Sequence, residues 1–237
     1  MKVIGIIPAR YASSRFPGKP LADILGKTMI QRVYEQCKKA SSLSKVIVAT
    51  DDERIFNHVL GFGGKAIMTS NTHPSGTDRC NEVIHSLKEK YDLAINIQGD
   101  EPYVNPEQID QVALLFSSKN VSIATLAKKI GDENIITDIN SPKVIFVTNG
   151  IALNFCRKIT NPTQEKSYFK HIGIYGYQTK TLTEICKLPP SKNEMKERLE
   201  QLRWLDNKYI IKVGITTHEG ISVDTLEDIE KIKAQMG

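Results

Sequence analysis

The chain has 237 residues, of which 40% are hydrophobic and 25% charged, and its formal net charge is +5. This length suits one large α/β domain or two small ones, and the basic residues, clustered no more densely than pairs such as Lys38-Lys39, argue against a nucleic-acid partner. The four cysteines stand singly, which favours neither a zinc site nor a disulfide framework. No stretch approaches the roughly 20 apolar residues of a membrane span, so we expect a cytoplasmic protein without membrane insertion.

The first predicted element is a strand over Lys2–Ile7, whose apolar run is typical of the centre of a parallel sheet. It leads into a loop that ends at Pro20 and carries Arg10, Arg15 and Lys19, three cations that can converge on one polyanion. Open α/β sheets bind ligands at the carboxyl ends of their strands, where this loop lies. The loop contains neither a Walker P-loop nor a GxGxxG motif, so it is either another kind of phosphate site or a solvated basic loop.

Strands and helices then alternate, as they do in a parallel α/β sheet. Arg79 stands in the first turn of a predicted helix, where the macrodipole disfavours a cation, so we expect either an anionic partner or a solvated side chain. The predicted helices are 28–39, 54–60, one capped by Thr77 that runs to Leu87, and one capped by Asn105 that runs to about Phe116; the strands are 45–49, 65–69, 93–97 and 121–127.

The alternation stops after residue 127. The segment 143–177 reads mainly as strands, 144–148, 151–155 and 171–177, which we interpret as antiparallel and inserted. Two helices follow, and the segment Thr225–Asp228 has the pattern of a capping box that opens the last helix. The remaining predicted elements are helices 181–187 and 193–204 and strand 212–217.

Two acidic residues are candidates for a metal site. Asp100 follows a buried strand and stands between Gly99 and Pro102, and Asp224 has a similar setting between a strand and a helix. Mg²⁺ on a nucleoside triphosphate usually takes one or two protein carboxylates and completes its coordination with phosphate oxygens and water. The two carboxylates can therefore meet over one metal; the alternatives are a turn acid and a helix-terminus carboxylate.

Seven stretches, spread over essentially the whole chain, resemble the 3-deoxy-manno-octulosonate cytidylyltransferases, or CMP-Kdo synthetases. They are 7–20, 49–51, 75–79, 96–102, 171–177, 199–203 and 223–225. The first and fourth are shared with sugar nucleotidyltransferases in general, whereas 171–177 and Glu200-Gln201 point to 3-deoxy-manno-octulosonate (Kdo).

The resemblance implies a three-layer α/β fold in a single nucleotidyltransferase domain, residues 1–237. Its sheet is mostly parallel and Rossmann-like, and a β-rich excursion over 128–177 completes the sugar site and pairs two subunits as a homodimer. The implied reaction transfers CMP from CTP to Kdo and gives CMP-Kdo and pyrophosphate for lipopolysaccharide biosynthesis.

The resemblance also implies a role for each candidate residue. Lys19 and Asp100 are catalytic, and Asp100 and Asp224 bind Mg²⁺. The nucleotide is bound by Arg10, Ser13, Ser14, Arg15, Lys19, Ser75, Arg79 and Gln98, and the sugar by Arg157, His171, Tyr175, Glu200 and Gln201.

Without the resemblance, the sugar-site residues have simpler interpretations. His171 is then a buried core histidine. Leu199 and Leu202 then lie on the side of a helix that faces the protein core, so Glu200 and Gln201 point away from the core into solvent.

Two alternative functions remain at this point. A cytidylyltransferase for another sugar acid, which would make CMP-sialate or CMP-8-amino-Kdo, would have much the same nucleotide half. A nucleotide-binding module without turnover is the other, although the presence of Asp100, Lys19 and both loop arginines argues against a dead site.

Overall fold

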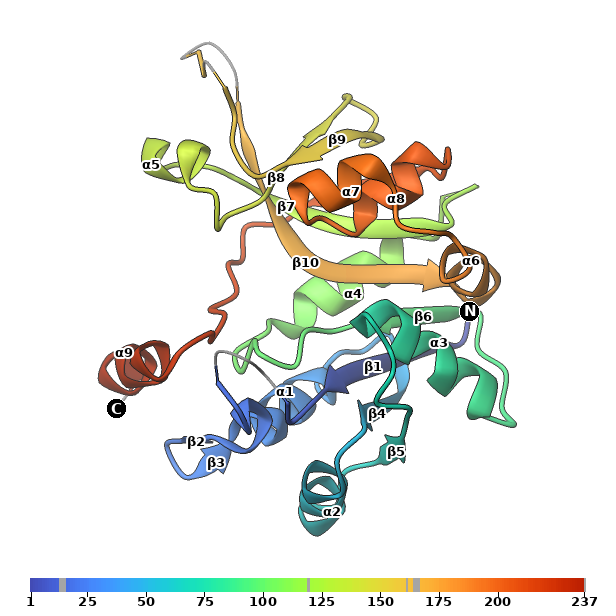
Figure 1. The fold of residues 1–237 in the computed structure, drawn as a ribbon, viewed down its shortest axis with the longest axis vertical. Helices are drawn as coiled ribbons and strands as arrows, with labels where there is room; N and C mark the ends of the chain where they lie inside the picture. The colour runs from blue at the N-terminus through green and yellow to red at the C-terminus, as the bar shows by residue number, and fades with distance from the viewer. Residues whose placement is uncertain (13–15, 119, 161, 164–166, 237) are drawn as a thin grey trace. The chain divides into compact units, whose positions relative to one another are not determined.

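The computed structural model describes all residues except 13–15, 119, 161, 164–166 and 237. The chain forms two compact units: unit 1 comprises residues 1–110 and 220–237, and unit 2 comprises residues 111–219. Both are drawn in Figure 1, with unit 1 in blue to green and its last segment in red. The interpretation of the chain as a single domain stays a prediction.

Unit 1 is built on a parallel sheet. Its strands are β1 (Val3–Ala9), β4 (Leu43–Thr50), β5 (Ala66–Met68) and β6 (Leu93–Asn96), in the order β6-β1-β4-β5. Ile4, Ile6 and Ile7 of β1 are fully buried, because β1 is a central strand and helices cover both faces of the sheet. The predicted buried first strand is confirmed.

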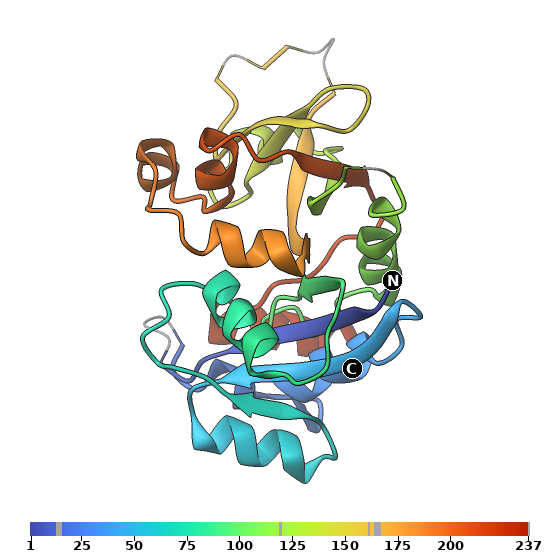
Figure 2. The same cartoon turned by 90° about the vertical axis from the view of Figure 1, so that its right-hand side faces the viewer.

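Three helices connect these strands. The chain passes through α1 (Met29–Cys37) and α2 (Glu53–Gly61) toward β5 and returns through α3 (Gly76–Ser86) to β6. Because parallel crossovers are right-handed, the return places α3 on the opposite face from α1 and α2, and Figure 2 shows α3 lying across the strands of unit 1. The cap of α3 is Ser75, which accepts from the Asp78 N–H, and not Thr77 as expected.

The last segment of the chain returns to unit 1. Helix α9 (Leu226–Met236) opens with the expected capping box, in which Thr225 Oγ1 accepts from the Asp228 N–H and Asp228 Oδ2 accepts from the Thr225 N–H. Its apolar face packs on a small cluster beside the short elements η1 (Lys19–Leu21), β2 (Asp23–Ile24) and β3 (Lys27–Thr28). The buried members of the cluster are Ile24, Met29, Val223, Ile229 and Ile232.

Unit 2 contains the expected antiparallel strands. β10 (Phe169–Gln178) lies antiparallel to β7 (Ile123–Lys129), which pairs in parallel with β11 (Ile211–Ile215). β8 (Lys143–Phe146) and β9 (Ala152–Cys156) form an antiparallel pair, and β8 also contacts the start of β10. The helices are α4 (Pro106–Leu115), which begins in unit 1, α5 (Glu133–Thr137), α6 (Thr179–Ile185), α7 (Lys192–Glu197) and α8 (Gln201–Asp206).

One predicted element of unit 2 is wrong. The helix expected over 193–204 is two helices, because Arg198 adopts a left-handed conformation with φ of 54° and ends α7. The chain restarts as α8, and this turn directs Gln201 inward, where only 5% of it is exposed. The alternative interpretation of Gln201 as a solvated side chain is therefore wrong as well. Among the described residues, no helix has the length and apolar character needed to cross a membrane.

Candidate active site

A cavity of about 300 Å³ lies in unit 1 at the carboxyl ends of β1 and β6. Segments far apart in the sequence form its wall: the residues after β1, the start of η1, the N-terminal end of α3, the loop after β6 and the residue before α9. These segments bring together seven of the predicted residues, Arg10, Lys19, Ser75, Arg79, Gln98, Asp100 and Asp224. Ser13, Ser14 and Arg15 lie outside the described residues.

Two glycines allow the loops around the cavity to approach closely. A Cβ on Gly99 would stand 2.7 Å from the carbonyl oxygen of Pro8, and one on Gly76 would stand 3.3 Å from Cγ of Pro8. A real Cβ does not approach a backbone oxygen so closely, so only glycine permits the contact at position 99. The end of β1 is thereby held between the loop after β6 and the start of α3.

Lys19 lies between the two predicted metal ligands. Its Nζ is 2.8 Å from Asp100 Oδ2, 3.6 Å from Asp224 Oδ1 and 2.9 Å from the carbonyl oxygen of Val223. A backbone hydrogen bond from the Val223 N–H to the Asp100 carbonyl, 2.9 Å long, holds the segment before α9 against the loop after β6. The two carboxylates therefore face one point, as the sequence predicted.

The donor set at this point fits Mg²⁺. No group of three or more His, Cys, Asp or Glu side chains suited to a metal occurs among the described residues. Two carboxylate oxygens beside an open cavity are nevertheless the protein share that Mg²⁺ usually takes when phosphate oxygens and water supply the rest. The site thus suits a metal that arrives with a polyphosphate.

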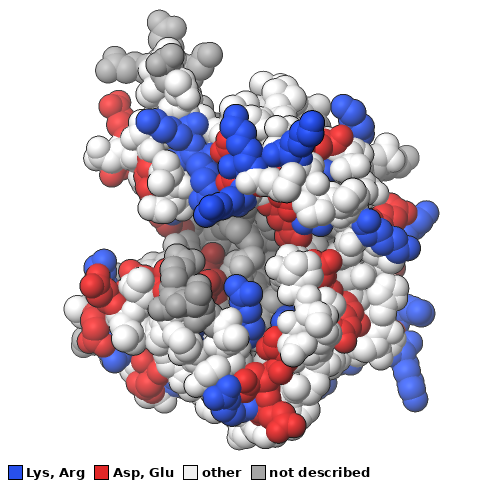
Figure 3. Space-filling view, in the orientation of Figure 1, with Lys and Arg blue, Asp and Glu red and all other residues white. Residues whose placement is uncertain are grey.

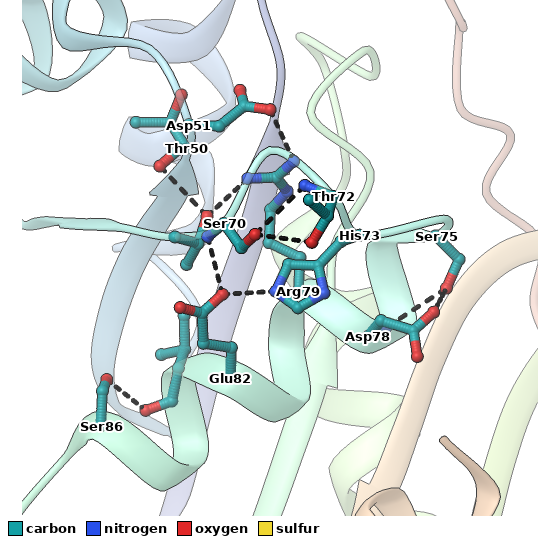
Figure 4. A network of polar contacts seen from close by, with 12 residues as sticks. Thr50, Asp51, Ser70, Thr72, His73, Ser75, Asp78, Arg79, Glu82 and Ser86 are labelled. Atoms are coloured by element: carbon teal, nitrogen blue, oxygen red, sulfur yellow. Dashed lines mark hydrogen bonds and ion pairs between the residues drawn. The ribbon is translucent and has the colours of Figure 1, made fainter. Parts of the chain in front are cut away.

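Of the two alternatives for Arg79, an anionic partner and a solvated side chain, the structure shows the first. The side chain is 4% exposed, and its guanidinium donates to Asp51 Oδ2 at 3.0 Å and to Thr69 Oγ1. Figure 4 shows the guanidinium held between the ends of β4 and β5 on one side and α3 on the other. Because a protein carboxylate already binds it, Arg79 is a rigid part of the cavity wall.

Sequence reasoning assigned no role to His73, which also lines the cavity. Its Nε2 contacts Glu82 Oε2, which also accepts from the Ser70 N–H at 2.9 Å (Figure 4). Burial tends to raise the pKa of the Glu82 carboxyl, but the hydrogen bonds from His73 and Ser70 outweigh it and hold that pKa below its usual value. The position of His73 two residues before the cap of α3, in a polar loop after a strand, is the signal that could have identified it.

The predicted sugar-binding residues lie in unit 2, where three of them are buried together. His171 and Tyr175 stand on β10 with ring centroids 5.2 Å apart, and Gln201 begins α8. Thr125 Oγ1 is 3.0 Å from His171 Nε2, and burial lowers the pKa of His171 to about 3, so its imidazole is neutral. Burial, with a smaller effect of Glu200, raises the pKa of Tyr175 well above its usual value.

Trp204 belongs to this group, although the sequence did not indicate it. Its ring is edge-on to that of Tyr175, with centroids 5.1 Å apart. Tyr175 Oη and Trp204 Nε1 are both buried, and neither makes a hydrogen bond of good geometry to a described residue, although the Thr125 hydroxyl is near enough to Tyr175 to oppose the rise of its pKa. A buried donor without a partner costs about 1–3 kcal/mol, so these two groups are candidates for contact with a polar ligand.

Arg157 has a different environment. Its guanidinium donates to the backbone carbonyls of Glu197 at 2.7 Å, Ile139 at 3.0 Å and Arg198 at 3.1 Å. Through these contacts, Arg157 connects α7 to the segment that precedes β8. Figure 3 shows basic side chains gathered on the drawn face of unit 2. Among the basic residues of this unit, Lys128 and Lys170 both form ion pairs with Glu219.

Comparison with known proteins matches this geometry to one class. The family model described as "Cytidylyltransferase" matches residues 4–215. Fold and site together define a nucleotidyltransferase of the cytidylyltransferase class. A 3-deoxy-manno-octulosonate cytidylyltransferase of Parabacteroides distasonis is 52% identical over 99% of this chain and 98% of its own, and one of Bacteroides thetaiotaomicron is 50% identical over 97% and 96%. The chain belongs to the 3-deoxy-manno-octulosonate cytidylyltransferase family.

Solved structures agree with this assignment. A CMP:2-keto-3-deoxy-manno-octonic acid synthetase complexed with CTP matches with a TM-score of 0.94 and 41% identity, over 100% of this chain and 98% of that one. A 4-diphosphocytidyl-2C-methyl-D-erythritol synthase from Anaerococcus prevotii matches with a TM-score of 0.67 and 15% identity over 99% and 98%, a likeness of fold alone. The predicted fold class, a mostly parallel α/β sheet of the sugar nucleotidyltransferase type, is confirmed.

Proposed function

We propose that this chain transfers CMP from CTP to Kdo and releases pyrophosphate, so that CMP-Kdo becomes available for lipopolysaccharide biosynthesis. The observation that carries the proposal is the meeting of Lys19, Asp100 and Asp224 at one point of the cavity in unit 1. The names of the relatives and the CTP bound to one solved relative support the choice of substrates.

CTP binds in the cavity of unit 1 in this proposal. Arg10 and Lys19 lie on the wall beside the carboxylates and contact the triphosphate, together with Ser13, Ser14 and Arg15 of the same loop. Ser75, Arg79 and Gln98 contact the rest of the nucleotide. The rigid placement of Arg79 by Asp51 lowers the entropy that the wall loses when the ligand binds.

Asp100 and Asp224 hold Mg²⁺ in this proposal. When bound, the metal supplies a hard positive charge that neutralises the triphosphate. Lys19 then places its ammonium against the phosphate oxygens and stabilises the charge that develops as the bond to pyrophosphate breaks.

The anomeric hydroxyl of Kdo attacks the α-phosphorus in line. A bond forms between that oxygen and the α-phosphorus, the bond from the α-phosphorus to the bridging oxygen breaks, pyrophosphate leaves, and the hydroxyl proton is lost. Such phosphoryl chemistry depends mainly on positioning and charge stabilisation. We assign the general base to no residue of this chain.

Kdo is bound by unit 2 in this proposal, through His171, Tyr175, Glu200, Gln201 and Arg157. The neutral imidazole of His171 and the buried Tyr175 Oη and Trp204 Nε1 offer hydrogen-bonding groups of both kinds to a polyhydroxylated acid. Of these residues, Arg157 has the least support, because three backbone carbonyls already bind it.

A homodimer is also part of the proposal, formed through the β-rich excursion. Large apolar side chains on and beside β8 and β9 are exposed: Ile145 by 43%, Val147 by 39% and Leu153 by 59%. Neighbouring exposed apolar side chains are typical of an interface. We place the enzyme in the cytoplasm, consistent with four cysteines that are all free thiols.

The test is pyrophosphate release from CTP with a panel of sugar acids. We expect turnover with Kdo to exceed that with sialate and 8-amino-Kdo by orders of magnitude. Preferred turnover of another sugar acid would assign the chain that substrate, and CTP binding without turnover of any sugar would favour the non-catalytic module.

A further inference from the structure

Lys19 occupies the point where the two carboxylates of the proposed metal site converge. Its ammonium has three oxygen neighbours within 3.6 Å, Asp100 Oδ2, Asp224 Oδ1 and the Val223 carbonyl. The side chain of Lys19 is 16% exposed, compared with 29% for Asp100 and 44% for Asp224. The lysine side chain is thus the least exposed of the three.

The position of the Lys19 ammonium affects the repulsion between the two carboxylates in the free protein. Two carboxylates that face one point repel each other, and the repulsion is stronger where the site is partly shielded from water. The ammonium between them offsets it. The same ammonium stands in the way of a metal ion, because a cation that reaches both carboxylates must displace Lys19 or bear its repulsion.

A triphosphate gives Lys19 another partner. Arg10 lines the same cavity as Lys19, so an anion bound in it lies within reach of a flexible lysine side chain. Once the ammonium has turned to phosphate oxygens, both carboxylates are available to a metal. Metal and nucleotide therefore assist each other's binding, and this coupling is reciprocal.

The geometry points to Lys19 as a built-in placeholder for the metal ion: in the free protein its ammonium bridges Asp100 and Asp224, and Mg²⁺ enters when a nucleoside triphosphate draws the ammonium away. The inference rests on the proposed function, which places both ligands in this cavity. It adds that the nucleotide binds before the metal, and it explains why Lys19 lies beside both the metal ligands and the proposed triphosphate site.

The test measures metal binding directly. Mn²⁺ is titrated into wild type, Lys19→Met, Lys19→Gln and Arg10→Met, and free Mn²⁺ is followed by electron paramagnetic resonance, with and without CTP and in the absence of any sugar. Arg10→Met is the matched control, since it removes one positive charge from the same cavity wall. We expect Lys19→Met and Lys19→Gln to bind Mn²⁺ alone about tenfold more tightly than wild type, and Arg10→Met to change this affinity about twofold or less.

Once the Mn²⁺ bound by CTP itself is subtracted with a titration that lacks protein, CTP should raise the Mn²⁺ affinity of wild type about tenfold and that of the Lys19 variants much less. The melting temperature gives a second readout, because Mg²⁺ alone should raise it more in Lys19→Met than in wild type. Equal Mn²⁺ affinities of wild type and both Lys19 variants would overturn the placeholder, as would an equal gain in Arg10→Met. Failure of the metal site itself would look different, since no variant would then bind Mn²⁺ even with CTP.

Discussion

At the scale of single residues, Asp100 connects several segments of unit 1. Its carboxylate contacts Lys19, and its backbone carbonyl accepts from Val223, so one residue connects the loop after β6, the start of η1 and the segment before α9. Replacing Asp100 with Asn keeps the shape of the side chain and removes the charge that a hard cation requires.

We expect Asp100→Asn to retain its fold and to lose at least about a hundredfold of its Mg²⁺-dependent turnover, since a lost charge contact costs roughly 3 kcal/mol. The measurement is pyrophosphate release as Mg²⁺ is varied, with circular dichroism as the check on folding. Wild-type turnover at ordinary Mg²⁺ would remove Asp100 from the metal site.

The burial of Gln201 excludes the simpler of its two interpretations. An amide that is 5% exposed at the start of α8, next to Glu200 and Trp204, does not belong to a solvated helix face. Its burial strengthens the case for a binding role, because a buried amide that loses its partner costs about 1–3 kcal/mol.

Gln201→Ala should therefore raise the KM for Kdo by about 10- to 100-fold, at about 1.4 kcal/mol per decade, and leave CTP binding nearly unchanged. Gln36→Ala, which removes a surface amide of unit 1 bonded to Lys39, is the control. An unchanged KM for Kdo, or an equal loss for CTP, would place the sugar elsewhere.

At the scale of elements, the close approach of the end of β1 to the loop after β6 requires a glycine at position 99. Gly99→Ala would place a Cβ 2.7 Å from the Pro8 carbonyl oxygen, and the loop must shift to relieve the contact. Gly131→Ala is a matched control, because nothing lies within 4 Å of its added Cβ.

We expect Gly99→Ala to lower the free energy of unfolding by about 1–3 kcal/mol and turnover by tenfold or more, since overpacking here moves Asp100. Urea denaturation and pyrophosphate release check the two effects. If Gly99→Ala behaves like Gly131→Ala, the loops are not held as described.

A second contact between elements depends on pH. Asp110 of α4 accepts from the backbone N–H and the hydroxyl of both Ser41 and Ser42, just before β4. Burial tends to raise the pKa of Asp110, but these hydrogen bonds outweigh it and hold the pKa below its usual value. A depressed folded-state pKa stabilises the fold at pH values above the unfolded-state pKa of about 3.9, and the stabilisation is lost as the pH falls through the folded-state pKa.

Asp110→Ala should cost about 1–3 kcal/mol of unfolding free energy at pH 7, and the difference from wild type should shrink as the pH falls below about 4. Urea denaturation at several pH values measures it. Glu230→Ala, at an exposed ion pair with Lys233 on α9, is the control and should cost little at any pH. A loss for Asp110→Ala that stays constant down to pH 2 would contradict the assignment.

The elements also show what sequence reasoning can reach. The apolar runs of β1 and β6 predicted two buried parallel strands, and a polar loop follows each of them. Because parallel strands bring their carboxyl ends to one edge of the sheet, these loops predicted a ligand site at that edge. The break between α7 and α8 left no local signal, since no Pro occurs between 191 and 207 to end the helix and no Gly occurs there to mark the left-handed conformation that Arg198 takes. The contact of Arg79 with Asp51 arises only when segments distant in the sequence meet.

At the scale of the whole molecule, the proposed homodimer depends on the exposed apolar side chains of the excursion. Leu153→Asp should convert the dimer to monomers, because a charge would enter the apolar interface, while unit 2 keeps its fold since the side chain is 59% exposed. Sedimentation velocity measures the change. Met195→Asp, on α7 at 62% exposure, is the control and should stay dimeric. A monomeric wild type, or a dimeric Leu153→Asp, would place the interface elsewhere.

The return of residues 220–237 to unit 1 has a consequence for biosynthesis. Asp224 and the Val223 carbonyl, two of the three oxygen neighbours of Lys19, come from the segment 220–237, whereas Lys19 and Asp100 are made more than a hundred residues earlier. Domains generally fold as the ribosome releases them, the N-terminal parts first. The proposed metal site of a nascent chain therefore stays incomplete until Asp224 has been made, and a chain that stops before this residue carries the nucleotide loop and Asp100 but lacks the second carboxylate.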